Sequence, residues 1–284
     1  MTSLTPSDFP MRRDTYLQAL QTKVHGDARV RAAWVEGSLG RGTADRYSDI
    51  DLHLSLEDAD VADFTANAQS WLSAIHPLVL YTSMFDGHML NALTDHGIRV
   101  DVWPHAGHTV TLDPNRIVIL HQQHGAVTSD DQPERLDAAA QGQRVLTLLR
   151  EFWRCVTLLP AVIGRSESLV AFSGLAVELG LVTELLVADA GAQRDRGVKH
   201  LNAYLREQDR AFLETVLRVP ELSAPTLVTA HLGLVQVVRE RGPTVTERLG
   251  VTYPRDLETA ALRYVGAELI QLGIDIERLL DAHV

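Results

Sequence analysis

The chain has 284 residues, of which 45% are hydrophobic, and its formal net charge is −11 from 26 basic and 37 acidic residues. This length allows one large domain or two smaller ones. The acidic balance argues against a large nucleic-acid surface, which needs clustered Lys and Arg. It favours a cationic substrate, the alternative being an acidic surface that serves solubility alone. A single cysteine excludes an internal disulfide. We find no signal-peptide pattern and expect no apolar run that is long enough to cross a membrane. These features predict a cytoplasmic protein.

The first part of the chain alternates strand and helix patterns. We predict helices over residues 7–25 and 58–75, strands over residues 29–35 and 49–56, and a glycine-rich turn with a short helix over residues 37–44. Three further strands are predicted over residues 78–85, 88–93 and 98–103. Short connections such as Asp86-Gly87 favour antiparallel hairpins. This order predicts a mixed sheet with helices on one side.

The pattern changes after about residue 130, where strand alternation gives way to long helical stretches. Predicted helices cover residues 133–159, 167–189, 198–217, 226–240 and 255–282. The polar run at residues 128–131 is a natural boundary. The sequence therefore predicts an α+β protein, with a catalytic domain over residues 1–128 and an α-helical bundle domain over residues 129–284.

Two carboxylates share one face of the strand predicted over residues 49–56. Asp49 and Asp51 are two residues apart, which places their Cα atoms about 7 Å from each other on the same side of a strand. Like charges at this spacing repel unless a cation lies between them, and carboxylate oxygens suit Mg²⁺ or Mn²⁺. Asp101 lies within an apolar strand pattern, where a carboxylate without a partner is costly, so we expect it to serve a metal or catalytic site.

A glycine-rich turn precedes these acids and contains Gly37, Ser38, Gly40 and Gly42. Glycines let the backbone approach an anion closely, and N–H groups at a turn or helix start bind phosphate. A phosphate-binding turn beside a metal site with two carboxylates implies phosphoryl or nucleotidyl transfer.

The segment from Trp34 to Leu56 resembles the signature of the nucleotidyltransferase superfamily that includes DNA polymerase β. Gly37-Ser38 is followed after ten residues by Asp49-Ile50-Asp51-Leu52, and Asp101 in IRVDVW looks like the third acid that these enzymes carry on a later strand. The resemblance covers about the first 120 residues. It implies a nucleotidyltransferase fold, ATP as co-substrate, and two Mg²⁺ ions, both bound by Asp49 and Asp51 and one of them also by Asp101.

The resemblance also implies roles for residues near the turn. Gly37 and Ser38 are expected to contact the triphosphate, and the alternative role of Ser38 is a helix N-cap. Arg41 and Arg46 either neutralise phosphate charge or are solvated, with Arg41 nearer the turn. Ser48 resembles a serine that precedes the first acid in related enzymes, and a local hydrogen-bond role is equally open.

The helical half is expected to supply further groups. Glu178 and Glu184 interrupt a highly apolar helix, so each is a candidate general base, the alternative being a salt-bridged structural residue. Lys199 lies in VKHLNAYL, which resembles a pattern of small-molecule nucleotidyltransferases, and is expected either to reach the triphosphate or to be a surface lysine. His121 and His124 have no evident third ligand, so we expect no zinc site there.

Together these features predict metal-dependent transfer of AMP from ATP to a hydroxyl of a small molecule, with release of pyrophosphate. Size, acidity and the helical second half resemble aminoglycoside or lincosamide nucleotidyltransferases, which implies a small, cationic acceptor such as an antibiotic. The alternatives are a nucleotidyltransferase that modifies a protein or tRNA, as toxin–antitoxin relatives do, and a non-catalytic nucleotide-binding protein. The sequence leaves the oligomeric state open.

Overall fold

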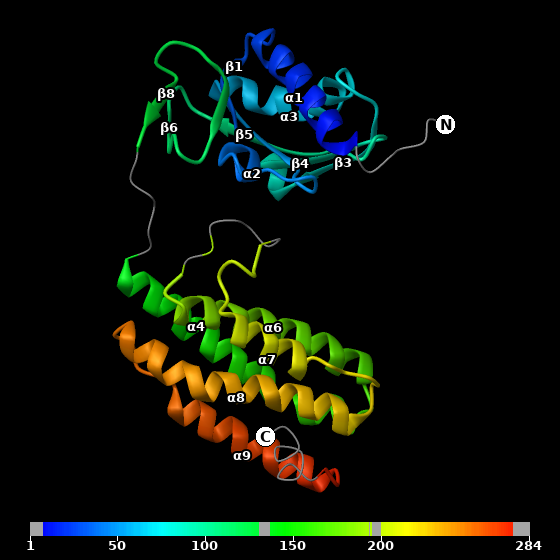
Figure 1. Ribbon diagram of the computed structural model, residues 1–284, viewed down its shortest axis with the longest axis vertical. Helices are drawn as coiled ribbons and strands as arrows, with labels where there is room; N and C mark the ends of the chain where they lie inside the picture. Colours follow the sequence, from blue (N-terminus) through cyan, green and yellow to red (C-terminus); the bar gives the residue numbers. More distant parts are fainter. Residues whose placement is uncertain (1–7, 131–136, 193, 195–199, 275–284) are drawn as a thin grey trace. The chain divides into compact units, whose positions relative to one another are not determined.

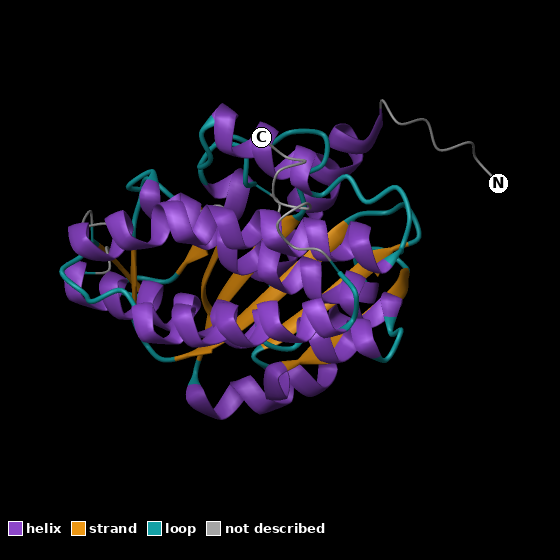
Figure 2. Cartoon of the chain, turned by 90° about the horizontal axis from the view of Figure 1, so that it is seen from below, coloured by secondary structure: helices purple, strands orange, loops and turns teal. Residues whose placement is uncertain are grey.

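The computed structural model describes residues 8–130, 137–192, 194 and 200–274, and the chain divides into two compact units, Met1–Glu134 and Arg135–Val284. Every strand among the described residues belongs to the first unit, and the described part of the second unit is helical (Figures 1 and 2). The predicted fold class, an α+β part with a mixed sheet followed by a helical part, is confirmed.

The first unit is built on a six-stranded sheet with the strand order β3-β4-β5-β2-β1-β7. Its strands are β1 (Val30–Val35), β2 (Ile50–Leu56), β3 (Leu78–Met84), β4 (Met89–Thr94), β5 (Arg99–Ala106) and β7 (Val118–Gln122). β2 and β5 run parallel, whereas the other neighbouring pairs are antiparallel, as the predicted hairpins require. A smaller parallel pair consists of β6 (Val110–Leu112) and β8 (Val127–Ser129).

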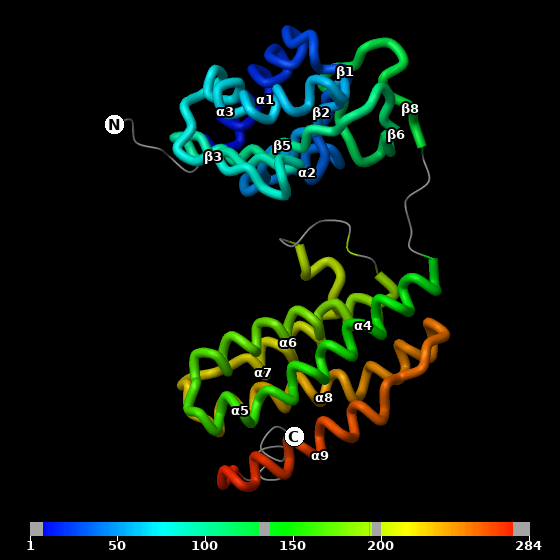
Figure 3. Tube along the Cα trace, turned by 180° about the vertical axis from the view of Figure 1, so that it is seen from behind, coloured from blue at the N-terminus to red at the C-terminus, as the bar shows by residue number. Residues whose placement is uncertain are grey.

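Two helices cover one face of the six-stranded sheet. α1 (Phe9–His25) and α3 (Asp58–Ser73) lie on the same side of the strands (Figures 1 and 3). Alternate strand residues such as Leu52, Leu54 and Val100 form the core with Leu20 of α1 and Phe64 of α3. The residues between these core positions therefore point to the opposite face. Two short helical turns complete the unit, α2 (Gly37–Gly40) and η2 (Phe85–Gly87).

The second unit is a helical bundle with its own core. Its helices are α4 (Ala138–Val156), α5 (Leu159–Gly164), α6 (Ser168–Asp189), α7 (Glu207–Val216), α8 (Ala224–Arg248) and α9 (Arg255–Gln271). α6 packs against α8 and α4, and Phe152 and Trp153 are fully buried between the helices.

The boundaries of three predicted helices are wrong. α9 ends at Gln271 and does not continue towards residue 282, because Gly273 follows in a left-handed conformation with a φ of +74°. α7 begins at Glu207 and not near residue 198, because Arg206 is extended and donates hydrogen bonds to the side chain and carbonyl of Asp189. α8 continues to Arg248 although it contains Pro243, where the sequence predicts an end at residue 240. An interior proline costs about 3 kcal/mol, and buried side chains on both sides of Pro243 provide the packing that outweighs this cost.

The expectation that no segment is apolar enough to cross a membrane is also wrong. α6 passes that test by length and composition, with a hydropathy of 1.8. In the structure it lies within the bundle, where Val182, Leu185 and Leu186 are in the core. Only 44% of its apolar window is buried, and Leu169, Val170 and Val177 are exposed, so packing in the bundle accounts for part of its composition.

The two faces of the sheet should respond differently to truncation. We expect Leu54→Ala to lower the free energy of unfolding by about 2–5 kcal/mol, because Leu54 is fully buried beneath the helices. Leu80→Ala is the matched control, since Leu80 is 51% exposed, and should cost less than about 1 kcal/mol. Urea unfolding followed by tryptophan fluorescence measures both, and equal losses would contradict this assignment of the faces.

Candidate active site

Three carboxylates converge on the sheet face opposite to α1 and α3. Asp51 of β2 and Asp101 of β5 are register partners on the two parallel strands, so their side chains stand next to each other. Asp49 immediately precedes β2. Each of the three offers a carboxylate oxygen, and these oxygens all lie within 4.8 Å of one another.

This donor set fits a divalent cation that binds oxygen. Mg²⁺ holds octahedral oxygen ligands at about 2.1 Å, which places ligands of one ion roughly 3–4 Å apart. The spacing of the three acids is compatible with that geometry, and all three are partly exposed. The amide of Asn91 on β4 donates a hydrogen bond to Oδ1 of Asp101 at 2.5 Å. This bond orients one of the three carboxylates.

The glycine-rich turn contacts the acids directly. Gly37 has a φ of +64°, and a Cβ at this position would overlap the carboxylate of Asp51. The N–H of Glu36 donates to the carbonyl oxygen of Asp51 at 3.0 Å, which connects the end of β1 to β2. Glycine is therefore required at position 37 both by its conformation and by the close approach. The turn that begins α2 is held against the candidate metal site.

The structure places the other predicted residues of the phosphate-binding region as follows. Ser38 lies within α2, and Arg41 follows its last residue. The hydroxyl of Ser48 donates to the Asp45 carboxylate and accepts from the Asp45 N–H, both at 2.9 Å. Ser48 therefore has the local hydrogen-bond role that the sequence left open. Lys199 lies outside the described residues.

Both glutamates predicted as candidate bases have polar side-chain partners. Oε2 of Glu178 lies 2.8 Å from Nδ1 of His231, and both side chains are buried in the bundle. Glu184 contacts Arg144 at 2.9 Å and Arg194 at 2.7 Å, one through each carboxylate oxygen. This buried contact with His231 is the arrangement expected of the structural alternative, and a role of Glu178 as the base stays a prediction. Glu184 likewise shows the salt-bridged arrangement.

A group of rings that the sequence did not reveal lies on the same sheet face as the acids. This ring row consists of Trp34 of β1, His53 of β2, and Trp103 and His105 of β5. Their stacked pairs have centroids 5.1–5.9 Å apart. His53 is two residues beyond Asp51 on the same strand, so the ring row begins beside the acids. The alternation along β2 and β5 was visible in the sequence, but the meeting of the rings depends on strand register.

Polar contacts connect the ring row to Glu36, the residue before Gly37. Trp34 Nε1 donates to Oε1 of Glu36 at 2.9 Å, and Nε2 of His53 lies 3.9 Å from Oε2 of Glu36. Nδ1 of His53 and Nε2 of His105 are 2.9 Å apart, so one imidazole donates to the other. Burial lowers the pKa of His53 to about 4, although the carboxylate of Glu36 acts in the opposite direction. His53 is therefore neutral at pH 7.

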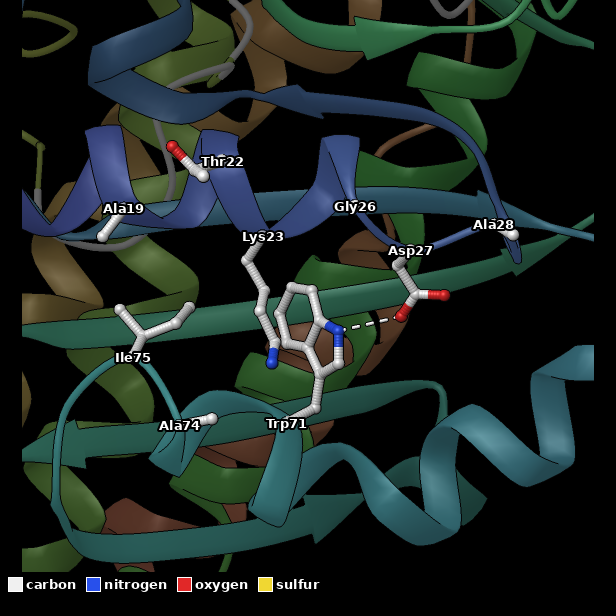
Figure 4. A pocket seen from close by; sticks show the side chains of 9 residues that line it. All are labelled: Ala19, Thr22, Lys23, Gly26, Asp27, Ala28, Trp71, Ala74 and Ile75. Atoms are coloured by element: carbon white, nitrogen blue, oxygen red, sulfur yellow. Dashed lines mark hydrogen bonds between the residues drawn. The ribbon is translucent and has the colours of Figure 1, made fainter.

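A pocket of about 520 Å³ between α1 and α3 is separate from this site. Figure 4 shows Lys23 and Trp71 facing each other in it, with Nζ of Lys23 5.8 Å from the indole centroid. Asp27 accepts a hydrogen bond from Trp71 Nε1 at 2.9 Å and pairs with Arg29 at 2.8 Å. None of the three acids lines this pocket, and its charged groups serve one another, so it is not the candidate active site.

The low pKa of His53 makes stability depend on pH. As pH falls, the unfolded chain binds this proton near pH 6.5 and the folded chain only near pH 4. The contribution of neutral His53 is therefore complete above about pH 6.5 and is lost as pH falls towards 4, with a limiting slope of about 1.4 kcal/mol per pH unit. We expect the urea midpoint to fall more steeply between pH 7 and 5 in the wild type than in His53→Gln. Equal slopes would exclude His53 as the cause.

No protein-family model matches the chain, and neither does any curated protein. Among solved structures, an aminoglycoside 6-adenyltransferase from Bacillus subtilis is 15% identical, with a TM-score of 0.42, over 90% of this chain and 97% of that one. The STING-associated CdnE c-di-GMP synthase from Capnocytophaga granulosa is 11% identical, with a TM-score of 0.29, over 84% and 83% of the two chains. CdnC in the CdnC:HORMA-deltaN complex from E. coli MS115-1 is 16% identical, with a TM-score of 0.28, over 92% and 93%.

Because all three TM-scores are below 0.5, the function proposed below rests on the residues of the candidate site.

Proposed function

We propose that the protein is a metal-dependent nucleotidyltransferase that transfers AMP from ATP to a hydroxyl of a small acceptor and releases pyrophosphate. The observation that carries this proposal is the convergence of Asp49, Asp51 and Asp101 within 4.8 Å, beside a turn in which only glycine fits. Three clustered carboxylates create a strongly negative local potential, for which a divalent cation is the natural ligand. A cytoplasmic location suits an enzyme that consumes ATP.

In this proposal Asp49, Asp51 and Asp101 hold two Mg²⁺ ions, as the superfamily resemblance implies. When bound, such ions would neutralise the negative charge of the triphosphate and activate the acceptor hydroxyl. The residues of the chain position the reactants. Asn91 orients Asp101, and Gly37 keeps the turn close to Asp51. In this proposal the hydroxyl of Ser38, the next residue, would contact the phosphates.

We infer a cationic acceptor from the groups beside the acids. The side chain of Glu36 is 43% exposed and lies at the edge of the ring row. A carboxylate of this kind would pair with an ammonium group of the acceptor. The net charge of −11 acts in the same direction over longer distances. An aminoglycoside-type acceptor meets these requirements.

Pyrophosphate release from ATP and Mg²⁺, measured across a panel of aminoglycosides and lincosamides, tests the proposal. We expect release that requires one compound class and falls by at least about 100-fold in Asp51→Asn and Asp101→Asn, because each change removes charge from the cation site. Asp86→Asn is the matched control, since Asp86 is exposed and its φ of +53° is tolerated by Asn.

Each outcome bears on a different part of the proposal. If Asp101→Asn kept the turnover of the wild type, Asp101 would not be a metal ligand of the active site. If ATP binds in a metal-dependent manner but no compound causes pyrophosphate release, the acceptor would instead be a protein or tRNA. Absence of ATP binding to the wild type would contradict nucleotidyl transfer altogether.

A further inference from the structure

A second group of metal-ligating side chains lies away from the three acids. His76 follows α3, and Asp95 and His96 lie in the turn between β4 and β5. Each offers one ligand atom, and these atoms lie within 4.8 Å of one another. We propose that His76, Asp95 and His96 bind a divalent transition-metal ion of the zinc class.

The separations between the ligand atoms suit such an ion. Oδ1 of Asp95 lies 3.1 Å from Nδ1 of His76 and 3.9 Å from Nε2 of His96. Tetrahedral Zn²⁺ with bonds of about 2.1 Å to nitrogen and oxygen places its ligand atoms roughly 3.4 Å apart. These two distances lie on either side of this value, and the third pair of ligand atoms lies within 4.8 Å.

Nδ1 of His76 is not explained by an ordinary ion pair. This atom is buried and makes no hydrogen bond, although it lies 3.1 Å from Oδ1 of Asp95. Buried polar atoms nearly always have a partner, and one that lacks a partner requires an explanation. A cation that accepts the nitrogen lone pair supplies that partner, since imidazole binds metals in its neutral form.

The donor set also determines which metal the site prefers. Two imidazole nitrogens and one carboxylate favour Zn²⁺, Co²⁺, Ni²⁺ or Cu²⁺ over Mg²⁺, whereas the three acids offer oxygen only. Three protein ligands leave a fourth position for water. The side chains of Asp95 and His96 are 44% and 45% exposed, which gives an ion access from solvent.

Backbone hydrogen bonds hold the ligands in place. The Asp95 N–H donates to the carbonyl oxygen of Pro77 at 3.2 Å, which joins the chain segment after α3 to the β4–β5 turn. The Thr94 hydroxyl accepts from the Ile98 N–H at 3.0 Å and closes that turn. β5 leads from this turn to Asp101. A bound ion would therefore stabilise the hairpin that carries one of the three acids.

Titration of the untagged full-length chain with Zn²⁺ alone, by calorimetry, tests this site. We expect His76→Ala and His96→Ala each to weaken Zn²⁺ binding by at least about 10-fold, because each removes a ligand. His88→Ala is the matched control, an exposed histidine of the same unit, and should bind as the wild type does. Asp101→Asn should also retain this Zn²⁺ binding, which separates the two sites.

A second measurement identifies the coordination. Co²⁺ bound to the wild type should give the visible absorption of a tetrahedral site, and His96→Ala should lose it. His96 is exposed in a turn, so this variant is expected to keep the fold, and circular dichroism checks that it does. Equal Zn²⁺ affinity in the wild type and both histidine variants, or no Zn²⁺ binding to the wild type, would overturn the proposal.

Discussion

The parallel pairing of β2 and β5 is the constraint on which the candidate active site depends. It makes Asp51 and Asp101 register partners, and it buries Leu52 and Val102 on the other face, in the core with α1 and α3. A shift of one residue would turn every side chain of a strand to the opposite face, exposing leucine and burying carboxylate. The packing of the apolar face therefore maintains the geometry of the acids.

The same register brings together groups with different chemistry. Beyond the acids, the ring row lies along the same face of β1, β2 and β5, with Glu36 at its edge and Trp34 buried against Leu112 and Ala126. Gly37 follows Glu36 directly and approaches Asp51. The end of β1 thus connects a cluster of three carboxylates, a glycine-rich turn and the partly exposed carboxylate of Glu36. These are the groups that transfer of a nucleotide to a cationic acceptor needs.

Local signals predicted the strands and the placement of the acids, because period-two alternation and a glycine turn are encoded within a few neighbouring residues. The ring row could not be predicted in this way, because it depends on which strands pair. Trp34 of β1 and His105 of β5 stack on each other because β2 lies between these two strands in the sheet. The contact between Glu178 and His231 joins residues that are 53 positions apart in the sequence. The sequence around Glu178 therefore could not reveal that its carboxylate has a buried partner. α8 continues through Pro243 because contacts with distant helices outweigh a local helix-breaking signal.

The most direct test of the central claim is a crystal structure of the protein grown with Mn²⁺ and a non-hydrolysable ATP analogue, with anomalous scattering used to locate the metal. The account predicts Mn²⁺ bound by Asp49, Asp51 and Asp101, with the triphosphate of the analogue next to Gly37 and Ser38. Mn²⁺ and nucleotide bound elsewhere, with the three acids in contact with neither, would contradict it.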